Sequence, residues 1–127
     1  MKHTRASGRR LEKLISICGS LPEVAVAVIG REGEHRSFIV RKEIFGYYTF
    51  DHHGDGREAL LCKAPAGEQG RLVEEDPRRF FVPPYVGPQG WVGVRLDVGK
   101  PDWSEIAYLT RAAYRLTAPR TLGARLE

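Results

Sequence analysis

Residues 37–50, SFIVRKEIFGYYTF, contain two runs of β-forming residues with almost nothing between them, and these runs indicate the class of fold. β-Branched and aromatic side chains dominate residues 37–42 and 44–50, and only about one residue, Glu43, separates the two runs. Such residues suit a pleated, half-buried surface, and so short a separation is typical of a tight hairpin. The sequence therefore predicts antiparallel β-structure near the middle of the chain.

Further elements are predicted on both sides of this hairpin. In residues 9–19 apolar side chains recur at helical spacing, Ser7 can cap the start and Gly19 can end the helix. A last helix begins at Asp102, which can form a capping box with Glu105. The remaining predicted elements are strands at 24–29, 59–63 and 91–96 and a short helix at 68–75. The order α-β-β-β-β-α-β-α predicts an α+β fold, an antiparallel β-sheet with helices packed on one face.

The composition is typical of one globular domain. A chain of 127 residues has room for one core and not for two, so we expect a single domain over 1–127, with 1–6 and 120–127 as flexible ends. Apolar residues make up 42% and charged residues 28%, which excludes the signature of a disordered chain. No apolar run approaches the roughly 20 residues that cross a bilayer, and the first residues are charged. We therefore expect a cytoplasmic protein without a membrane partner.

The charge of the chain favours anionic partners. The formal net charge is +4, and 15 of the 20 basic residues are arginine. A guanidinium group matches phosphate geometry and stacks on aromatic rings, so this excess favours nucleic acids or acidic protein surfaces. A charge of this size also occurs in proteins that bind neither.

Catalysis has no support in the sequence. No nucleophile lies beside a recognisable base, and neither a dinucleotide-binding glycine loop nor a phosphate loop is present. Cys18 and Cys62 lie on apolar stretches and are expected to be buried free thiols. We therefore expect a protein that is not an enzyme and needs no cofactor.

Two histidines and two acidic residues gather in one short segment, and a metal site there is the alternative to a plain turn. The residues are Asp51, His52, His53 and Asp55. Adjacent side chains on an extended backbone point in opposite directions, so His52 and His53 would share one ion only in a contorted turn. Because Gly54-Asp55-Gly56 is also good turn chemistry, we expect an exposed turn and no metal.

A basic and aromatic surface is predicted from the alternation of side chains along the strands. The positions opposite to the strongly apolar set are Arg41, Tyr47, Lys63, Trp91 and Arg95. On one exposed face, these side chains would offer phosphate contacts and stacking surfaces of the kind used in nucleic-acid grooves. The alternative is a face whose aromatic side chains pack beneath a loop at residues 83–90.

Several short strings carry a family resemblance over most of the chain. They are YY (47–48), DHHGDG (51–56), CKAP (62–65), DP (76–77), FFVPPY (80–85), GWVGVRLD (90–97) and PDW (101–103). Together they resemble the MmcQ/YjbR-like family. The resemblance implies a fold similar to the secretion-chaperone-like fold, and it brings no catalytic residues. Members are commonly labelled DNA-binding by analogy with a proposed double-wing arrangement, which makes Lys63, Tyr85, Trp91 and Arg95 candidate contact residues.

Two kinds of function are favoured over a third, an enzyme that would use His52 or His53 with Asp55. In the first, the protein binds DNA or RNA through Arg41, Lys63 and Arg95 on phosphates, with Tyr85 or Trp91 stacking on bases. In the second, the aromatic loop from Phe80 to Gly90 binds a protein or a small ligand, or forms a homodimer contact.

Overall fold

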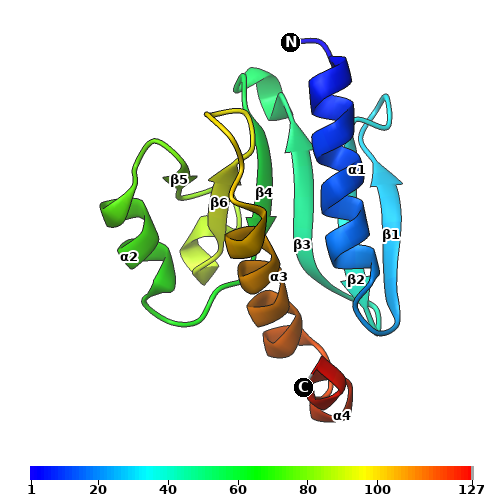
Figure 1. Cartoon of the computed structure of the whole chain (residues 1–127). Coiled ribbons are helices and arrows are strands. Elements are labelled where there is room, and N and C mark those ends of the chain that lie inside the picture. The colour runs from blue at the N-terminus through cyan, green and yellow to red at the C-terminus, as the bar shows by residue number, and fades with distance from the viewer. Residues whose placement is uncertain (127) are drawn as a thin grey trace.

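A computed structural model describes residues 1–126 and shows an α+β domain (Figure 1). Its helices are α1 (Arg5–Gly19), α2 (Glu68–Glu75), α3 (Trp103–Thr117) and α4 (Arg120–Gly123). Its strands are β1 (Val24–Ile29), β2 (His35–Val40), β3 (Glu43–Phe50), β4 (Glu58–Cys62), β5 (Phe80–Phe81) and β6 (Val92–Arg95). Three 3₁₀ turns complete the described chain, η1 (His52–Gly54), η2 (Gly87–Gln89) and η3 (Ala124–Leu126).

The six strands form one antiparallel sheet in the order β1-β2-β3-β4-β6-β5. Helices α1 and α3 lie across one face of this sheet, and α2 lies beside β5 at its end (Figure 1). The predicted fold class and the predicted packing of helices on one face are confirmed. No described helix has both the length and the apolar character to cross a membrane.

The central hairpin forms as predicted, with its turn shifted by two residues. Strand β2 ends at Val40, and the turn consists of Arg41 and Lys42, which both have positive φ angles of 49° and 71°. Two left-handed residues in succession match the twist of the flanking strands, so this turn holds the hairpin better than one at Glu43 would. Arg41 was predicted inside a strand, and that placement is wrong.

The core lies between the sheet and the two long helices. Leu14 and Cys18 of α1 and Tyr114 of α3 are fully buried against Phe38 and Tyr48 of the sheet. Both cysteines are buried and free, as predicted.

A buried ion pair connects α1 to the sheet. Glu58 on β4 is completely buried, and its Oε1 accepts a hydrogen bond from Arg10 Nε at 2.8 Å. The hydroxyl of Tyr48 donates to the other oxygen, Oε2, at 2.8 Å. Burial and this bond raise the pKa of Tyr48, so it stays protonated. A buried carboxylate is tolerated only when its oxygens are paired in this way.

Both chain ends contain more helix than the sequence predicted. Helix α1 begins at Arg5, not at residue 9, because Thr4 rather than Ser7 is its N-cap. The Thr4 hydroxyl accepts from the Ser7 backbone N–H at 3.0 Å, and Ser7 Oγ accepts from the Thr4 N–H at 2.8 Å. At the other end α4 buries Leu122, whereas Glu127 lies outside the described residues.

Candidate functional site

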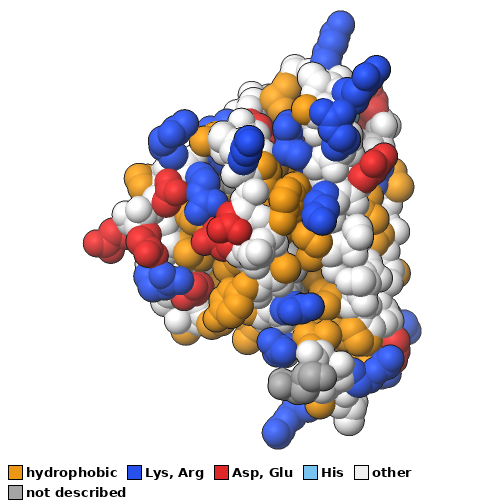
Figure 2. All heavy atoms as spheres, in the orientation of Figure 1, with side chains coloured by type: hydrophobic (Ala, Val, Ile, Leu, Met, Phe, Trp, Pro, Cys, Tyr) orange, Lys and Arg blue, Asp and Glu red, His pale blue; other side chains and the backbone are white. Residues whose placement is uncertain are grey.

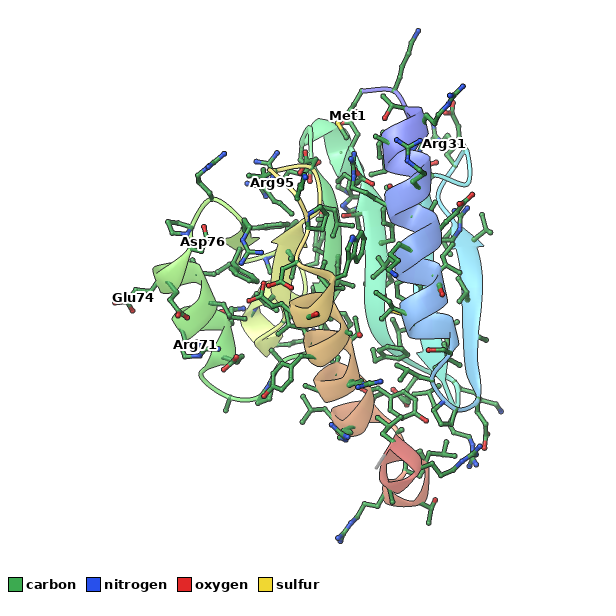
Figure 3. All side chains as sticks on the ribbon, viewed as in Figure 1. Met1, Arg31, Arg71, Glu74, Asp76 and Arg95 are labelled. Atoms are coloured by element: carbon green, nitrogen blue, oxygen red, sulfur yellow. The ribbon has the colours of Figure 1, made fainter. Side chains whose placement is uncertain are left out.

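The structure does not gather the five predicted contact residues into one exposed patch. Arg41 lies in the β2–β3 turn, where its Nε donates to Glu23 Oε1 at 2.7 Å. This hydrogen bond holds the pKa of Glu23 below its usual range. Arg95 lies on β6 (Figure 3) and donates to both oxygens of Asp97, at 3.1 and 3.0 Å. Both guanidinium groups are therefore paired with carboxylates.

The remaining predicted residues differ in exposure. Trp91 is only 5% exposed, and its ring lies 5.7 Å from that of Tyr47. Lys63 is half-buried just beyond the end of β4, and Tyr85 is 73% exposed. Trp91 is therefore not an exposed contact residue. The alternative predicted from the sequence, in which aromatic side chains of this face pack beneath the loop at 83–90, is the one observed, since Phe81 and Val86 pack over Trp91. A second apolar cluster results, in which Ala59, Leu61 and Trp91 are buried.

The 80–90 segment is less irregular than its prolines and glycines suggested. Phe80 and Phe81 form β5 and pair with Val94 and Gly93 of β6. The Phe81 ring lies directly over Gly93, where any side chain would collide with it. Because Gly93 has no side chain, the 80–90 segment can pass close over the sheet at this point.

A pocket of about 260 Å³ lies between this segment and the sheet, on the face opposite to α1 and α3. The sheet supplies Tyr47, Thr49 and Leu61, the covering segment supplies Phe81 and residues 84–86, and Ile29, His35, His52 and Asp55 complete the lining. Apolar and aromatic walls with a few polar groups are typical of small-molecule sites.

His35 is the most constrained polar residue of this pocket. It is 9% exposed, and its Nδ1 accepts a hydrogen bond from the Phe50 backbone N–H at 3.0 Å. The neutral ring therefore carries its proton on Nε2, which lies 3.3 Å from Glu34 Oε1. Burial lowers the pKa of His35, so the ring is neutral at physiological pH.

The turn between β3 and β4 brings His52 into the lining of the pocket and places the His53 ring beside it. Asp51 and His53 have positive φ angles of 51° and 54°, so the side chains do not alternate as they would on an extended backbone. The rings of His52 and His53 consequently lie 4.0 Å apart, and the Tyr85 ring lies 6.4 and 6.0 Å from them. The expectation that the two histidines point apart is wrong. Even so, no three His, Cys, Asp or Glu side chains within residues 1–126 are placed to hold a metal ion together.

A second hollow lies on the helix face and is basic. It is a groove of about 510 Å³ between α1 and the segment that precedes α3, and it is lined by Ala6, Arg9, Arg10, Lys13, Gly99, Lys100, Pro101 and Trp103. Figure 2 shows Lys and Arg side chains gathered around the start of α1 on this face. None of the eight lining residues is acidic.

Sequence reasoning missed this groove because it considered only the positions along the strands. A signal was present, since Arg9 and Lys13 are four residues apart and so lie on one side of a helix. The third cation, Lys100, is distant in sequence, and only the packing of α3 against the sheet brings it to α1.

These observations define a small α+β domain with a basic groove on the helix face of its sheet and an aromatic pocket on the other face. The chain belongs to the YjbR family, whose model matches residues 19–116. The resemblance noted in the sequence is thereby confirmed.

A solved structure supports the fold. The crystal structure of the Deinococcus radiodurans protein DR2400, described by its family-model domain DUF419, is similar with a TM-score of 0.68. The two chains are 22% identical, and the match covers 84% of this chain and 76% of that one. No curated protein matches the chain.

Proposed function

We propose that the protein is a non-catalytic domain that binds nucleic acid, and that the basic groove holds the phosphate backbone. The observation that supports this proposal is the set of exposed cations, Arg9, Lys13 and Lys100, that line one groove free of acidic residues. Phosphate contacts of this kind supply most of the sequence-independent affinity of proteins for DNA and RNA.

The charges of the groove are available for a ligand. Arg9, Lys13 and Lys100 form no ion pair with any residue between 1 and 126, whereas the neighbouring Arg10 is held by Glu58. The nearby carboxylate of Asp102 accepts a hydrogen bond from the Glu105 backbone N–H at 3.1 Å and so caps α3. The half-buried indole of Trp103 adds an apolar surface to the groove, on which a sugar or base can pack.

The sheet face is the less suitable surface for phosphates. Arg41 and Arg95 would have to give up their carboxylate partners, and the Trp91 ring is covered. The proposal therefore keeps the predicted class of partner, DNA or RNA, and moves the contact from the sheet to the helix face.

The non-catalytic part of the proposal is supported by the state of the thiols. Burial raises the pKa of Cys62 to about 12 and raises that of Cys18 as well. Both sulfurs are therefore protonated at neutral pH and lack the thiolate that catalysis by a cysteine nucleophile requires.

Fluorescence anisotropy with labelled 20-nucleotide single-stranded and duplex DNA and RNA, between 50 and 200 mM NaCl, tests the proposal. Three phosphate contacts predict a slope of log affinity against log salt of about −2 for single strands and about −2.7 for duplex DNA. The variant Arg9→Gln/Lys13→Gln/Lys100→Gln should lose most of that slope and about tenfold or more in affinity at 50 mM NaCl.

A matched control removes the same charge elsewhere. Lys42, Arg111 and Arg120 are exposed and lie outside the groove, so Lys42→Gln/Arg111→Gln/Arg120→Gln should retain most of the affinity and the slope. Equal losses in both triple variants would mean that only net charge matters, and binding without salt dependence would exclude phosphate contacts. Either result overturns the proposal.

A further inference from the structure

We infer that the pocket beneath the 80–90 segment is a binding site for a small planar heteroaromatic molecule that carries an N–H donor, such as an amino-substituted purine. This site lies on the sheet face opposite to the basic groove, so it does not depend on the proposal for nucleic acid.

The volume of the pocket sets the size of the ligand. An apolar cavity of about 150 Å³ is large enough for benzene. At about 260 Å³, this pocket has room for a bicyclic ring system, and a larger ligand would extend out of it.

The walls favour a flat ring. Four aromatic side chains line the pocket together with Leu61, namely Tyr47, His52, Phe81 and Tyr85, and the rings of His52 and Tyr85 meet edge to face at 6.4 Å. Aromatic side chains bind planar molecules by stacking and edge-to-face contacts.

Tyr85 is held at the mouth by its backbone. It follows Pro83 and Pro84, has a φ of 67°, and is fixed by hydrogen bonds from the Val86 N–H to Pro84 O at 2.7 Å and from the Gly87 N–H to Pro83 O at 2.9 Å. A large residue is an outlier in the left-handed region, and such outliers cluster at ligand clamps. Tyr85 is nonetheless 73% exposed and lines the pocket, so its side chain can also contact a bound molecule.

Among the polar groups that line the pocket, only the Asp55 carboxylate is an acceptor alone, whereas the tyrosine and threonine hydroxyls and the histidine rings can accept or donate. The Asp55 carboxylate lies at the mouth, where only Oδ1 has a protein partner, the Arg57 backbone N–H at 2.9 Å. The Thr49 hydroxyl lies deeper and makes no hydrogen bond with any described residue, whereas both ring nitrogens of His35 are engaged. The guanidinium of Arg57 is not among the groups that line the pocket, and it lies over the Phe81 ring, 4.3 Å from the ring centre. A neutral ligand with an N–H donor complements the Asp55 carboxylate, and an anionic ligand would meet its charge.

Three probes separate the contributions of ring and donor. Calorimetry and amide chemical shifts should be recorded with 9-methyladenine, with 9-methylpurine, which lacks the amino group, and with benzoate, which is anionic. We expect 9-methyladenine to bind about tenfold more tightly than 9-methylpurine, because its amino group can donate a hydrogen bond to the charged Asp55 carboxylate. Benzoate should bind weakest, and the shifts should concentrate on residues 47–57 and 81–86.

Variants assign the roles of the side chains. Asp55→Asn and Thr49→Val should reduce the preference for 9-methyladenine over 9-methylpurine, whereas Tyr85→Ala should weaken both purines by about tenfold. The control Tyr108→Ala removes a tyrosine that is 69% exposed on α3 and should change neither affinity. Tyr85 and Tyr108 are both exposed, so neither variant should impair folding.

Several results would overturn the inference. They are equal affinities for the two purines, tightest binding of benzoate, no saturable binding of any probe, or shifts confined to the basic groove. The groove variant Arg9→Gln/Lys13→Gln/Lys100→Gln should still bind 9-methyladenine normally, which keeps this test separate from that of the proposed function.

Discussion

His35 shows how one side chain can be fixed in a single protonation state. Its Nδ1 already accepts a hydrogen bond from the Phe50 backbone N–H. A second proton would break that bond and place a positive charge on a buried ring. Glu34 lies close enough to Nε2 to favour that charge, but the effect of burial is larger and the pKa of His35 is lowered.

This shift predicts how stability depends on pH. In the unfolded chain the histidine takes up its proton near pH 6.5, whereas the folded form resists protonation until a lower pH. The unfolded state therefore binds more protons as pH falls below about 6.5, and the free energy of unfolding should decrease between pH 7.5 and 5.5. Urea denaturation across this range should show that decrease in the wild type and a smaller one in His35→Asn, whose amide oxygen can still accept from Phe50.

The exposed His53 provides the control. His53→Asn should retain the wild-type dependence of stability on pH, because this ring lies outside the buried pair of His35 and Phe50. If His35→Asn and the wild type lose stability in parallel, His35 is not the group responsible.

At the level of elements, the short strand β5 depends on a single glycine of β6. A Cβ at position 93 would overlap the Phe81 ring, and the lining of the pocket includes that ring. Gly93→Ala should therefore destabilise the protein by about 1–3 kcal/mol, the usual cost of overpacking, and should also weaken any ligand of the pocket. Chemical denaturation and the probe titrations measure the two effects.

A second glycine gives the matched control. Gly70 lies within α2, and no atom lies close to the position that a Cβ would take. Gly70→Ala should leave stability unchanged or raise it by up to about 1 kcal/mol, because alanine favours helix. A Gly93→Ala variant as stable as the wild type would show that Phe81 can move without cost.

The elements were more predictable than the surfaces built on them. Patterns of apolar, β-branched and aromatic residues identified α1, α2, α3 and five of the six strands, and β5 was missed. The burial of Trp91 depends on contacts with residues that are distant in sequence. The position of Arg41 depends on a turn of two left-handed residues. Alternation along a strand predicts which face of the sheet a side chain occupies, but it does not predict which other segment covers that face.

At the level of the whole molecule, the C-terminal residues complete the core. Helix α3 ends at Thr117, Pro119 turns the chain, and α4 places Leu122 in the main core at 4% exposure. Leu122→Ala should therefore lower the free energy of unfolding by about 2–4 kcal/mol, as expected for a large-to-small change in a core. Urea denaturation of the full chain measures this loss.

Leu116 is the corresponding control, because it is 53% exposed on α3. Leu116→Ala should change stability by roughly 0.5 kcal/mol or less. Equal effects of the two substitutions would mean that residues 120–126 do not contribute to the core in solution. The sequence predicted flexible ends because residues 120–127 contain only two leucines, Leu122 and Leu126, which are too few to form an apolar stripe.

The order of the strands also leaves β1 at one edge of the sheet. Its sequence, VAVAVI, has no charged residue, it pairs only with β2 among the described strands, and Val28 is 65% exposed. Natural sheets usually protect such an edge with a lysine, a proline or a bulge, and this strand has none of them. The free edge of β1 exposes backbone N–H and C=O groups that can pair with another copy of the protein. Self-association should therefore increase with concentration even when every molecule is correctly folded.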